Sequence, residues 1–293
     1  MAPSKPDALA LVGKRLAGGF RVLQHIGSGG AGDVYLAERS VAAASGEAHP
    51  ERFALKVLRT EQRRGSSLRR FQREALAAAR VRHPNVLRIV ETFVADPDLP
   101  FFAMELLVGL DLADTLSYSR VLSPTRAAGI AYGIAGGLGA AHASGIVHRD
   151  VKPENVFLVH AADGREVAKL VDFGFAHLDD DDPPVSGARP LGTPGYMAPE
   201  QMLGAAPDPR SDVYALGLVL LEMLSGRSPR TSGSGPLVEG ARAGFVSSPE
   251  MAEVLRRALD ADVDARFQSM NELAIALLAT REASGVHRRA DLT

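Results

Sequence analysis

The hydrophobic pattern divides the chain into two parts with different periodicities. In roughly the first hundred residues, short apolar runs alternate with polar turns, and their content of β-branched and aromatic residues is typical of strands. These runs lie at 20–26, 33–38, 52–58, 87–94 and 101–105. Between the third and fourth runs, apolar residues recur at helical spacing from about 67 to 81. The pattern predicts a β-rich N-terminal part with one helix, preceded by a flexible tail at 1–19.

Longer apolar segments in the second part predict helices. The uncharged stretch from Ala127 to Val147 is about as long as the ~20 residues that cross a bilayer. Its apolar weight comes from Ala and Gly, His142 interrupts it, and Ser123-Pro124 is a typical helix start. A buried helix is therefore favoured over a membrane span.

Two further helices carry capping signals. Ser211-Asp212 is expected to cap the strongly apolar helix that follows it. Ser269 and Glu272 have the spacing of a capping box, which would open a last helix that runs to about Thr280.

A glycine-rich turn connects the first two predicted strands. Its glycines are Gly27, Gly29, Gly30 and Gly32. Glycine lets backbone amides approach a phosphate without obstruction by side chains. In a dinucleotide-binding unit such a turn would open a helix, whereas the residues from Val34 onward continue as a strand. A phosphate-binding hairpin is therefore favoured, with a merely flexible hairpin as the alternative.

Lys56 lies within the apolar third run. Strand alternation places Ala54 and Lys56 on one face and their apolar neighbours on the other. An ammonium that leaves water without a partner is costly, and Glu74 on the predicted helix is the nearest suitable carboxylate. Lys56 is predicted to pair with Glu74 and to hold a phosphate. A solvated lysine on an edge strand is the alternative.

The stretch with the clearest chemistry is His148-Arg149-Asp150-Val151-Lys152-Pro153-Glu154-Asn155, followed at a distance by Asp172-Phe173-Gly174. Two carboxylates, a lysine and an amide in these segments are able to converge on a phosphate and its metal ion. One carboxylate is then left for an attacking hydroxyl. The residue types predict phosphoryl transfer.

The motifs follow the order Gly-rich loop, Lys56, Glu74, 148–155, 172–174, Ala198-Pro199-Glu200, Asp212 and Arg266. This ordered set resembles the protein kinases, and over about 20–280 the chain is similar to bacterial Ser/Thr kinases of the eukaryotic-like (Hanks) type. Lys152 and Thr193 favour Ser or Thr over Tyr as the acceptor, and Tyr214 stands where many eukaryotic members carry Trp.

The resemblance implies an α+β, bilobal fold. A small β-rich N-lobe with one key helix would span about 20–105, a hinge 105–109 and a larger helical C-lobe 110–280, followed by a polar tail at 281–293. Glu200 with Arg266 would be a structural ion pair, and His148 would be a packed, structural histidine.

The resemblance also implies the role of each site residue. Asp150 would accept or orient the substrate hydroxyl, Lys152 would steady the transferring phosphate, and Asn155 and Asp172 would bind Mg²⁺, or Mn²⁺ in its place. Residues expected around ATP are Ile26, Gly27, Gly29, Gly30, Gly32, Val34, Ala54, Lys56, Glu74, Met104, Glu105 and Leu107. Met104 would lie at the back of the adenine pocket, with ordinary core packing as the alternative. Glu105 to Leu107 would offer backbone hydrogen bonds to the base.

Composition limits the partners and the location. The 293 residues carry a formal net charge of -2, so no basic field supports binding to nucleic acid or to an anionic membrane. The absence of cysteine excludes disulfides and thiolate metal sites and fits a reducing cytosol. The first residues lack the apolar run of a secretory signal. We expect a cytoplasmic kinase that phosphorylates protein substrates, including itself.

Two other functions are weighed against this one. A nucleotide-binding pseudokinase scaffold typically lacks the lysine, the base or the metal aspartate, and all three are present here. A small-molecule phosphotransferase is disfavoured by the intact segment 192–200. Departures from the family pattern are Ala31 at the tip of the glycine loop, a long connection at 39–51, and a short, Gly/Ser-rich region at 227–248, where relatives often carry a fuller helix and loops that dock protein substrates.

Arg149, beside Asp150, suggests how the activity is regulated. In the family, such an arginine often belongs to a basic pocket that binds a phosphate on the activation segment. Between Gly174 and Gly192 only Ser186 is able to carry one, and Asp179–Asp182 lie upstream. These aspartates form either a solvated, mutually repelling loop or a permanent substitute for the phosphate, and both interpretations stay open.

Overall fold

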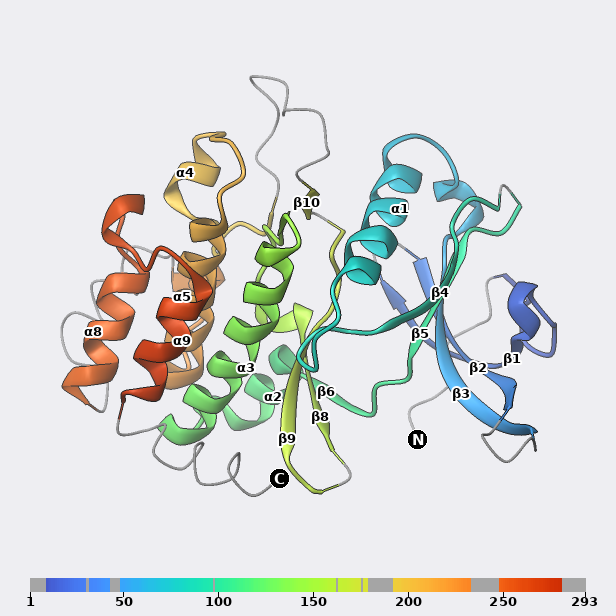
Figure 1. Ribbon diagram of the computed structural model, residues 1–293, viewed down its shortest axis with the longest axis horizontal. Coiled ribbons are helices and arrows are strands. Elements are labelled where there is room, and N and C mark those ends of the chain that lie inside the picture. Colours follow the sequence, from blue (N-terminus) through green and yellow to red (C-terminus); the bar gives the residue numbers. More distant parts are fainter. Residues whose placement is uncertain are drawn as a thin grey trace. The chain divides into compact units, whose positions relative to one another are not determined.

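The chain forms two compact units, Met1–Arg80 with Leu87–Val108 and Val81–Val86 with Gly109–Thr293. The computed structural model describes residues 9–29, 32–42, 48–96, 98–161, 163–174, 176–178, 192–232 and 248–280 (Figure 1). Gly30, Ala31, Asp179–Asp182, Ser186 and the predicted C-terminal tail lie outside the described residues.

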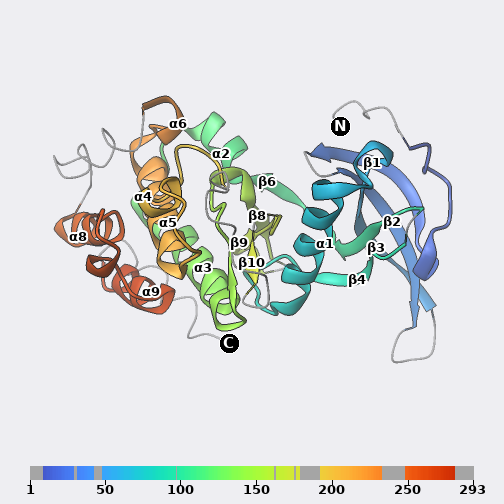
Figure 2. The ribbon, with the colours of Figure 1, turned by 90° about the horizontal axis from the view of Figure 1, so that it is seen from above.

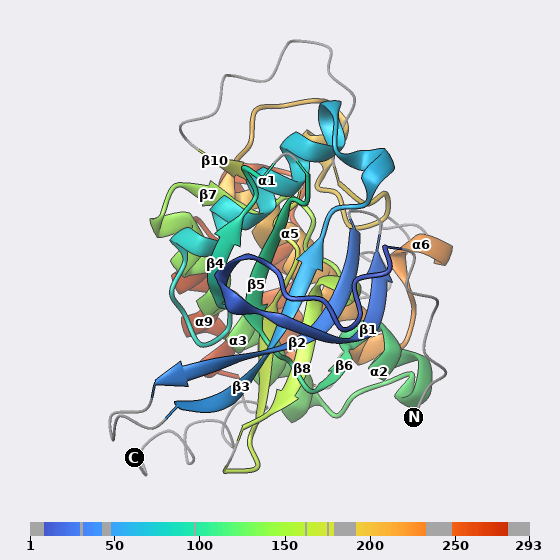
Figure 3. The same ribbon diagram turned by 90° about the vertical axis from the view of Figure 1, so that its right-hand side faces the viewer.

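In its described residues, the first unit contains an antiparallel five-stranded sheet and one α-helix (Figure 3). The strands are β1 (Arg21–Gly29), β2 (Gly32–Ala42), β3 (Ala48–Val57), β4 (Ile89–Phe93) and β5 (Phe101–Glu105), in the order β1-β2-β3-β5-β4. The helix is α1 (Gly65–Arg80), and short 3-10 turns lie at Ala17–Gly19 and Thr60–Gln62. All five predicted strands and the predicted helix are therefore present.

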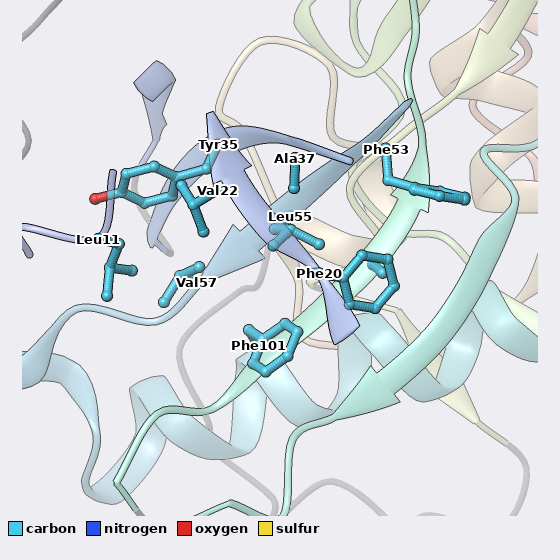
Figure 4. Packing of buried hydrophobic residues seen from close by; sticks show 10 residues of the cluster. Leu11, Phe20, Val22, Tyr35, Ala37, Phe53, Leu55, Val57 and Phe101 are labelled. Atoms are coloured by element: carbon cyan, nitrogen blue, oxygen red, sulfur yellow. The ribbon is translucent and has the colours of Figure 1, made fainter. Parts of the chain in front are cut away.

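Strand alternation gives this sheet two apolar faces. Phe53, Leu55 and Val57 are almost fully buried in a cluster on one face, which Figure 4 shows. Phe102 belongs to the other face, where Phe71 of α1 packs against it with the ring centroids 5.1 Å apart. The single helix is therefore fixed to the sheet by aromatic packing.

The described part of the predicted flexible tail is packed against the sheet. Leu11 is buried in the same cluster as Phe20 and Phe53. The amide of Gly13 donates to the carbonyl of Val22, and the amide of Val22 donates to the carbonyl of Lys14. Residues 9–19 therefore differ from the expectation because their leucines cover an apolar sheet face.

The described residues of the predicted connection at 39–51, namely 39–42 and 48–51, are strand. β2 and β3 stay paired through Ser40 opposite Pro50 and Val41 opposite His49. Val41 also packs against the buried cluster of the sheet. The composition of this connection did not indicate strand because this part of the chain is polar and Ala-rich, and Ser40, His49 and Pro50 are exposed.

The second unit is built mainly from helices. They are α2 (Leu112–Ser119), α3 (Pro124–Ala143), α4 (Pro199–Met202), α5 (Pro209–Ser225), α6 (Pro229–Ser232), α8 (Pro249–Ala258) and α9 (Met270–Leu278). α3 contacts both α5 and α9, and α5 contacts α8 (Figure 2). Of the predicted segment 227–248, only the part up to 232 and residue 248 are described.

Helix α3 accounts for the long apolar stretch. Its N-cap is Ser123, as predicted, and it ends before a turn in which Gly145 has a φ of 70°. The rest of the stretch is strand β7 (Ile146–Val147). Within the described ranges, no helix combines the length and the apolar character needed to cross a membrane.

Small sheets in the second unit were not predicted. β6 (Gly109–Asp111), β8 (Val156–His160) and β9 (Glu166–Leu170) form one sheet, and β7 pairs with β10 (His177–Leu178). A 3-10 turn at Pro153–Asn155 leads directly into β8. These short strands fix the segments that carry the motifs at 148–155 and 172–174.

The capping prediction for α5 is wrong. The N-cap is Asp208, whose side chain accepts a hydrogen bond from the amide of Arg210, and Pro209 opens the helix. Ser211 and Asp212 are buried inside its first turn. The Ser269 cap of α9 is confirmed, although the helix ends at Leu278.

Candidate active site

Lys56 is held within the first unit by a buried carboxylate. Its Nζ forms an ion pair with Oε1 of Glu74 on α1, and the two side chains are only 12% and 5% exposed. β3 is the central strand of the sheet, so the alternative of a solvated edge lysine is excluded. The predicted pair is confirmed, and the ammonium is oriented by a partner 18 residues away in sequence.

The glycine-rich turn is a strand–turn–strand unit. Gly27 lies opposite Val34, and Gly29 lies opposite Gly32. Gly32 has a φ of 151°, and a Cβ there would lie 2.4 Å from the carbonyl oxygen of Val57. Because β2 continues from Gly32 as a strand, the dinucleotide type of turn is excluded. Ile26 is 45% exposed beside the turn.

An unpredicted polar cluster fixes the base of this turn. Asp33 is buried, and Arg59 donates to it from Nε at 3.0 Å and from Nη2 at 2.9 Å. The hydrogen bonds from Arg59 outweigh burial and lower the pKa of Asp33. His25 Nε2 lies 3.4 Å from the same carboxylate. The signal in the sequence is a charged residue at a core-adjacent strand position.

The residues expected around the adenine share neighbouring strands. Ala54 lies opposite Met104 in the β3–β5 register. Met104 is partly buried and packs against the cluster that contains Phe102, so it contributes to the core of the first unit. The amide of Glu105 donates to the carbonyl of Arg88. That amide is therefore engaged, whereas Leu107 is half-buried beyond the end of β5.

Asp150 is at the centre of a compact polar triangle in the second unit. Lys152 Nζ donates to Asp150 Oδ2 and to Thr193 Oγ1, each at 2.6 Å, and Thr193 Oγ1 donates to Asp150 Oδ1 at 2.6 Å. Asp150 is 4% exposed. Thr193 therefore contacts both Asp150 and Lys152.

Asn155 connects the triangle to Asp172. Its Nδ2 donates to the carbonyl and to Oδ2 of Asp150, at 2.8 and 3.1 Å, which leaves its oxygen as the acceptor. The amide of Val171 donates to the carbonyl of Asn155 at 2.9 Å. This backbone bond places the residue before Asp172 beside Asn155.

Asp172 adopts a left-handed backbone conformation. Its φ of 61° lies in the left-handed region, which aspartate tolerates better than most residues, and its Oδ1 accepts from the amide of Gly174 at 3.0 Å. Phe173 is fully buried, with its ring 4.8 Å from that of His148. His148 is itself fully buried, which confirms its structural role.

Asp212 is a buried acceptor for the segment that precedes Asp150. It accepts from the amides of His148 and Arg149, at 2.9 and 2.8 Å, and from Nε2 of His142 at 2.8 Å. Burial alone would raise the pKa of Asp212, but these partners outweigh it and hold the pKa below its usual range. The carboxylate therefore supports a backbone in which Arg149 has a φ of 67°.

Comparison with known proteins agrees with this geometry. The family model described as protein kinase domain matches residues 20–277. The chain belongs to the protein kinase family. Serine/threonine-protein kinase pkn2 of Myxococcus xanthus is 38% identical over 297 residues, covering 95% of this chain and 34% of pkn2.

Two further relatives give the same picture. PrkC of Bacillus subtilis is 35% identical over 220 residues, covering 75% of this chain and 32% of PrkC. PkaB of Streptomyces coelicolor is 37% identical over 221 residues, covering 74% of this chain and 51% of PkaB. Both are serine/threonine-protein kinases by name. The chain thus spans about a third to a half of the length of these curated kinases.

The structural ion pair expected of this kinase domain is present. Arg266, fully buried, donates to Glu200 Oε1 at 2.7 Å and to Oε2 at 2.8 Å. Ser211 also donates to Glu200, and the guanidinium of Arg266 lies 4.9 Å from the ring of Tyr214. Burial raises the pKa of Glu200, but the hydrogen bonds from Arg266 and Ser211 outweigh it, so the pKa is lowered overall.

The two residues predicted to hold a metal ion both carry oxygen donors. Asn155 and Asp172 offer an amide oxygen and a carboxylate, a set that suits Mg²⁺ when nucleotide phosphates and water complete its shell. In the described part of the chain, no three His, Asp or Glu side chains cluster as a dedicated metal centre. The protein kinase family generally uses ATP and a divalent metal ion.

Proposed function

We propose that this chain is an ATP-dependent serine/threonine protein kinase. The observation that carries the proposal is the triangle of Asp150, Lys152 and Thr193, with all three hydrogen bonds at 2.6 Å. A carboxylate beside a lysine suits a reaction in which a hydroxyl loses its proton while negative charge moves through a phosphoryl group. The names of the relatives support Ser and Thr as acceptors.

In this proposal Asp150 orients the acceptor hydroxyl and receives its proton. Lys152 neutralises charge on the transferring phosphoryl oxygens. Before substrate enters, Lys152 and Thr193 share the two carboxylate oxygens of Asp150. A substrate hydroxyl would therefore replace part of an existing hydrogen-bond arrangement, in which the carboxylate is already aimed.

Other residues position the cofactor. Lys56, aimed by Glu74, would hold ATP phosphates below the backbone of Gly27, Gly29 and Gly32. Gly30, outside the described residues, belongs to the same proposal. The set that would enclose the nucleotide base is Ile26, Val34, Ala54, Met104, Glu105 and Leu107.

Asn155 and Asp172 would hold the metal ion, which we propose to be Mg²⁺, with Mn²⁺ able to replace it. When bound, such an ion neutralises phosphate charge. The donation from Asn155 Nδ2 to Asp150 leaves the amide oxygen for the ion. Asp172 contributes a carboxylate whose backbone is held by the bond between Val171 and Asn155.

We further propose that the kinase domain spans about 20–280, with a hinge near 105–109, and that it acts on protein substrates, including itself, in the cytoplasm. Nucleic acid is not an expected partner, because the net charge is -2. A pseudokinase scaffold is disfavoured because Lys56, Asp150 and Asp172 are all retained.

The test is a phosphotransfer assay with radiolabelled ATP, Mg²⁺ and a generic protein acceptor, followed by identification of the phosphorylated residues. We expect phosphoserine or phosphothreonine with the wild type. Asp150→Asn and Lys56→Met should fold normally, by circular dichroism, and lose transfer. Wild-type rates in both variants would refute the assigned roles, and ATP binding without any transfer would support a scaffold instead.

A further inference from the structure

A cavity of about 390 Å³ lies in the second unit, apart from the Asp150 triangle. Its wall is formed by α2, the turn at Pro153–Asn155, the segment after Thr193, and the chain from the end of α5 into α6. The volume lies within the range of pockets that accept small ligands or side chains. No residue given a role in phosphoryl transfer lines it.

The cavity nevertheless lies beside the segments that carry the Asp150 triangle. Glu154, in its wall, lies between Lys152 and Asn155 in sequence and immediately precedes the latter. Tyr196, also in the wall, donates its amide to the carbonyl of Thr193 at 3.1 Å. A peptide with its hydroxyl at Asp150 would therefore have a neighbouring side chain beside this cavity.

Two carboxylates face the cavity. Glu222 is 9% exposed, and it accepts a hydrogen bond from the phenol of Tyr196. Burial raises the pKa of Glu222. Glu154 is more exposed, and its Oε2 is a buried atom without a hydrogen-bond partner among the described residues. By itself this wall would attract a cationic side chain.

The chain already supplies such a side chain. Arg230 of α6 lines the cavity and its Nη1 lies 2.7 Å from Glu154 Oε1. Its guanidinium lies 5.5 Å from the centroid of the Tyr196 ring. The backbone of Arg230 also lies against Gly195, where a Cβ would come within 3.3 Å of the Arg230 amide nitrogen. Arg230 thus packs against the carboxylate of Glu154, the ring of Tyr196 and the backbone of Gly195.

We propose that Arg230 occupies, in cis, the place that a basic side chain of a protein substrate would take, and so determines specificity. This inference rests on the proposed kinase function. With Arg230 in this position, a second guanidinium would meet a like charge. Glu154 is already paired with Arg230, and Glu222 already accepts a hydrogen bond from Tyr196. Wild-type enzyme therefore does not select arginine at the substrate position next to this cavity, and Arg230 is the residue that prevents it.

The alternative role for Arg230 is to tie α6 to the turn at Pro153–Asn155. Both side chains of the Arg230–Glu154 pair are about 40% exposed, and such pairs contribute little to stability. A tether and a specificity residue make different predictions when the pair is broken. Only the specificity role predicts a changed preference for the charge of the substrate.

The experiment uses serine peptides in which one arginine or one glutamine is moved through the positions flanking the serine, with kcat/KM measured for each. Arg230→Gln should gain about ten-fold for arginine over glutamine at one position, the size of one charge-assisted hydrogen bond. The double variant Arg230→Gln/Glu154→Gln should lose that gain. Glu154→Gln alone leaves Arg230 without its counter-ion, and it should gain a preference for glutamate.

Arg230→Lys and Arg256→Gln are the matched controls, and both should behave as the wild type. Arg256 is a comparable surface arginine, 2.6 Å from Glu253 on α8. The proposal is overturned if folded Arg230→Gln gains no arginine preference, if the double variant keeps the gain, or if the wild type already selects arginine through Glu154. Should Arg230→Gln fail to fold, absence of the glutamate preference in Glu154→Gln overturns it.

A binding measurement separates this proposal from the kinase function. Fluorescence anisotropy of a labelled arginine peptide, without ATP, should report tighter binding to Arg230→Gln than to the wild type. If no variant phosphorylates any peptide, the kinase function fails, whereas the anisotropy ratio still decides the role of Arg230. Equal binding by the two proteins, with the glutamine peptide as reference, refutes it.

Discussion

Replacing Arg266 by methionine should strongly destabilise the second unit. Arg266 is fully buried and donates to both oxygens of Glu200 and to the carbonyl of Asp260 at 2.7 Å. Methionine fills much of the volume but leaves a carboxylate without its counter-ion. Breaking a buried ion pair from one side costs about 3–5 kcal/mol. The free energy of unfolding, measured by urea denaturation, should fall by that amount.

Two control variants separate the charge from the packing. Arg256→Met removes a surface pair, with both side chains at least half exposed, and should change stability by no more than about 1 kcal/mol. The double variant Glu200→Leu/Arg266→Met leaves no buried charge and should be more stable than Arg266→Met alone. If Arg266→Met stays within about 1 kcal/mol of the wild type, the pair is not a structural necessity.

The same pair predicts a pH dependence with a definite sign. Burial opposes ionisation of Glu200, yet its hydrogen bonds to Arg266 and Ser211 lower its pKa below the ordinary 4.5. Its stabilising contribution is therefore present above pH 4.5 and is lost as the pH falls through the lowered folded pKa. The free energy of unfolding, measured by urea denaturation between pH 3 and 7, should therefore vary less with pH in Glu200→Gln than in the wild type. Parallel profiles would contradict this.

Three further predictions concern single positions. Gly137→Ala should lower the free energy of unfolding, measured by urea denaturation, by about 1–3 kcal/mol, because a Cβ would lie 2.8 Å from the carbonyl oxygen of Asn85. Gly139→Ala is the control. Its Cβ would have its nearest contact at 3.5 Å, so this variant should be neutral or stabilising in the same assay. Glu222→Gln should gain more stability over the wild type at pH 8 than at pH 5, because burial raises the pKa of Glu222 and its contribution is lost as pH rises; an equal gain at both pH values contradicts this. Glu74→Gln removes the charge that aims Lys56, and initial rates of phosphotransfer should fall about ten-fold or more.

Local periodicity predicted the first unit well because its strands alternate cleanly. The run at 52–58 has apolar residues at every second position, and the structure buries them while Lys56 faces Glu74. The kinase resemblance is confirmed by the family match over 20–277. The roles of individual residues toward ATP and metal stay predictions, because they depend on ligands as well as on geometry.

The errors in the first unit occurred where stabilising partners are distant in sequence. Leu11 looks like part of a polar tail, and only the sheet that it covers shows why it is ordered. Ser40 and Val41 belong to a strand through pairing with Pro50 and His49, which no local run of hydrophobic residues indicates.

The α5 cap was misplaced because Asp208, Ser211 and Asp212 are all good capping residues. Pro209, favoured at the first helical position, is the signal that identifies Asp208.

Asp212 has a structural role that local sequence rules do not predict. An acidic residue in the first turn of a helix is favourable for the helix dipole, so its presence in α5 has an adequate local explanation. Its carboxylate instead accepts from the amides of His148 and Arg149, which precede it by 64 and 63 residues. Arg149 has a φ of 67°, a conformation that costs energy for a residue with a side chain, and the two accepted hydrogen bonds offset that cost. The next residue is Asp150, whose carboxylate must meet Lys152 and Thr193 at 2.6 Å. The nearly all-buried helix α5 is therefore the rigid support from which the backbone at Asp150 is positioned, and its apolar sequence serves the site as well as the core.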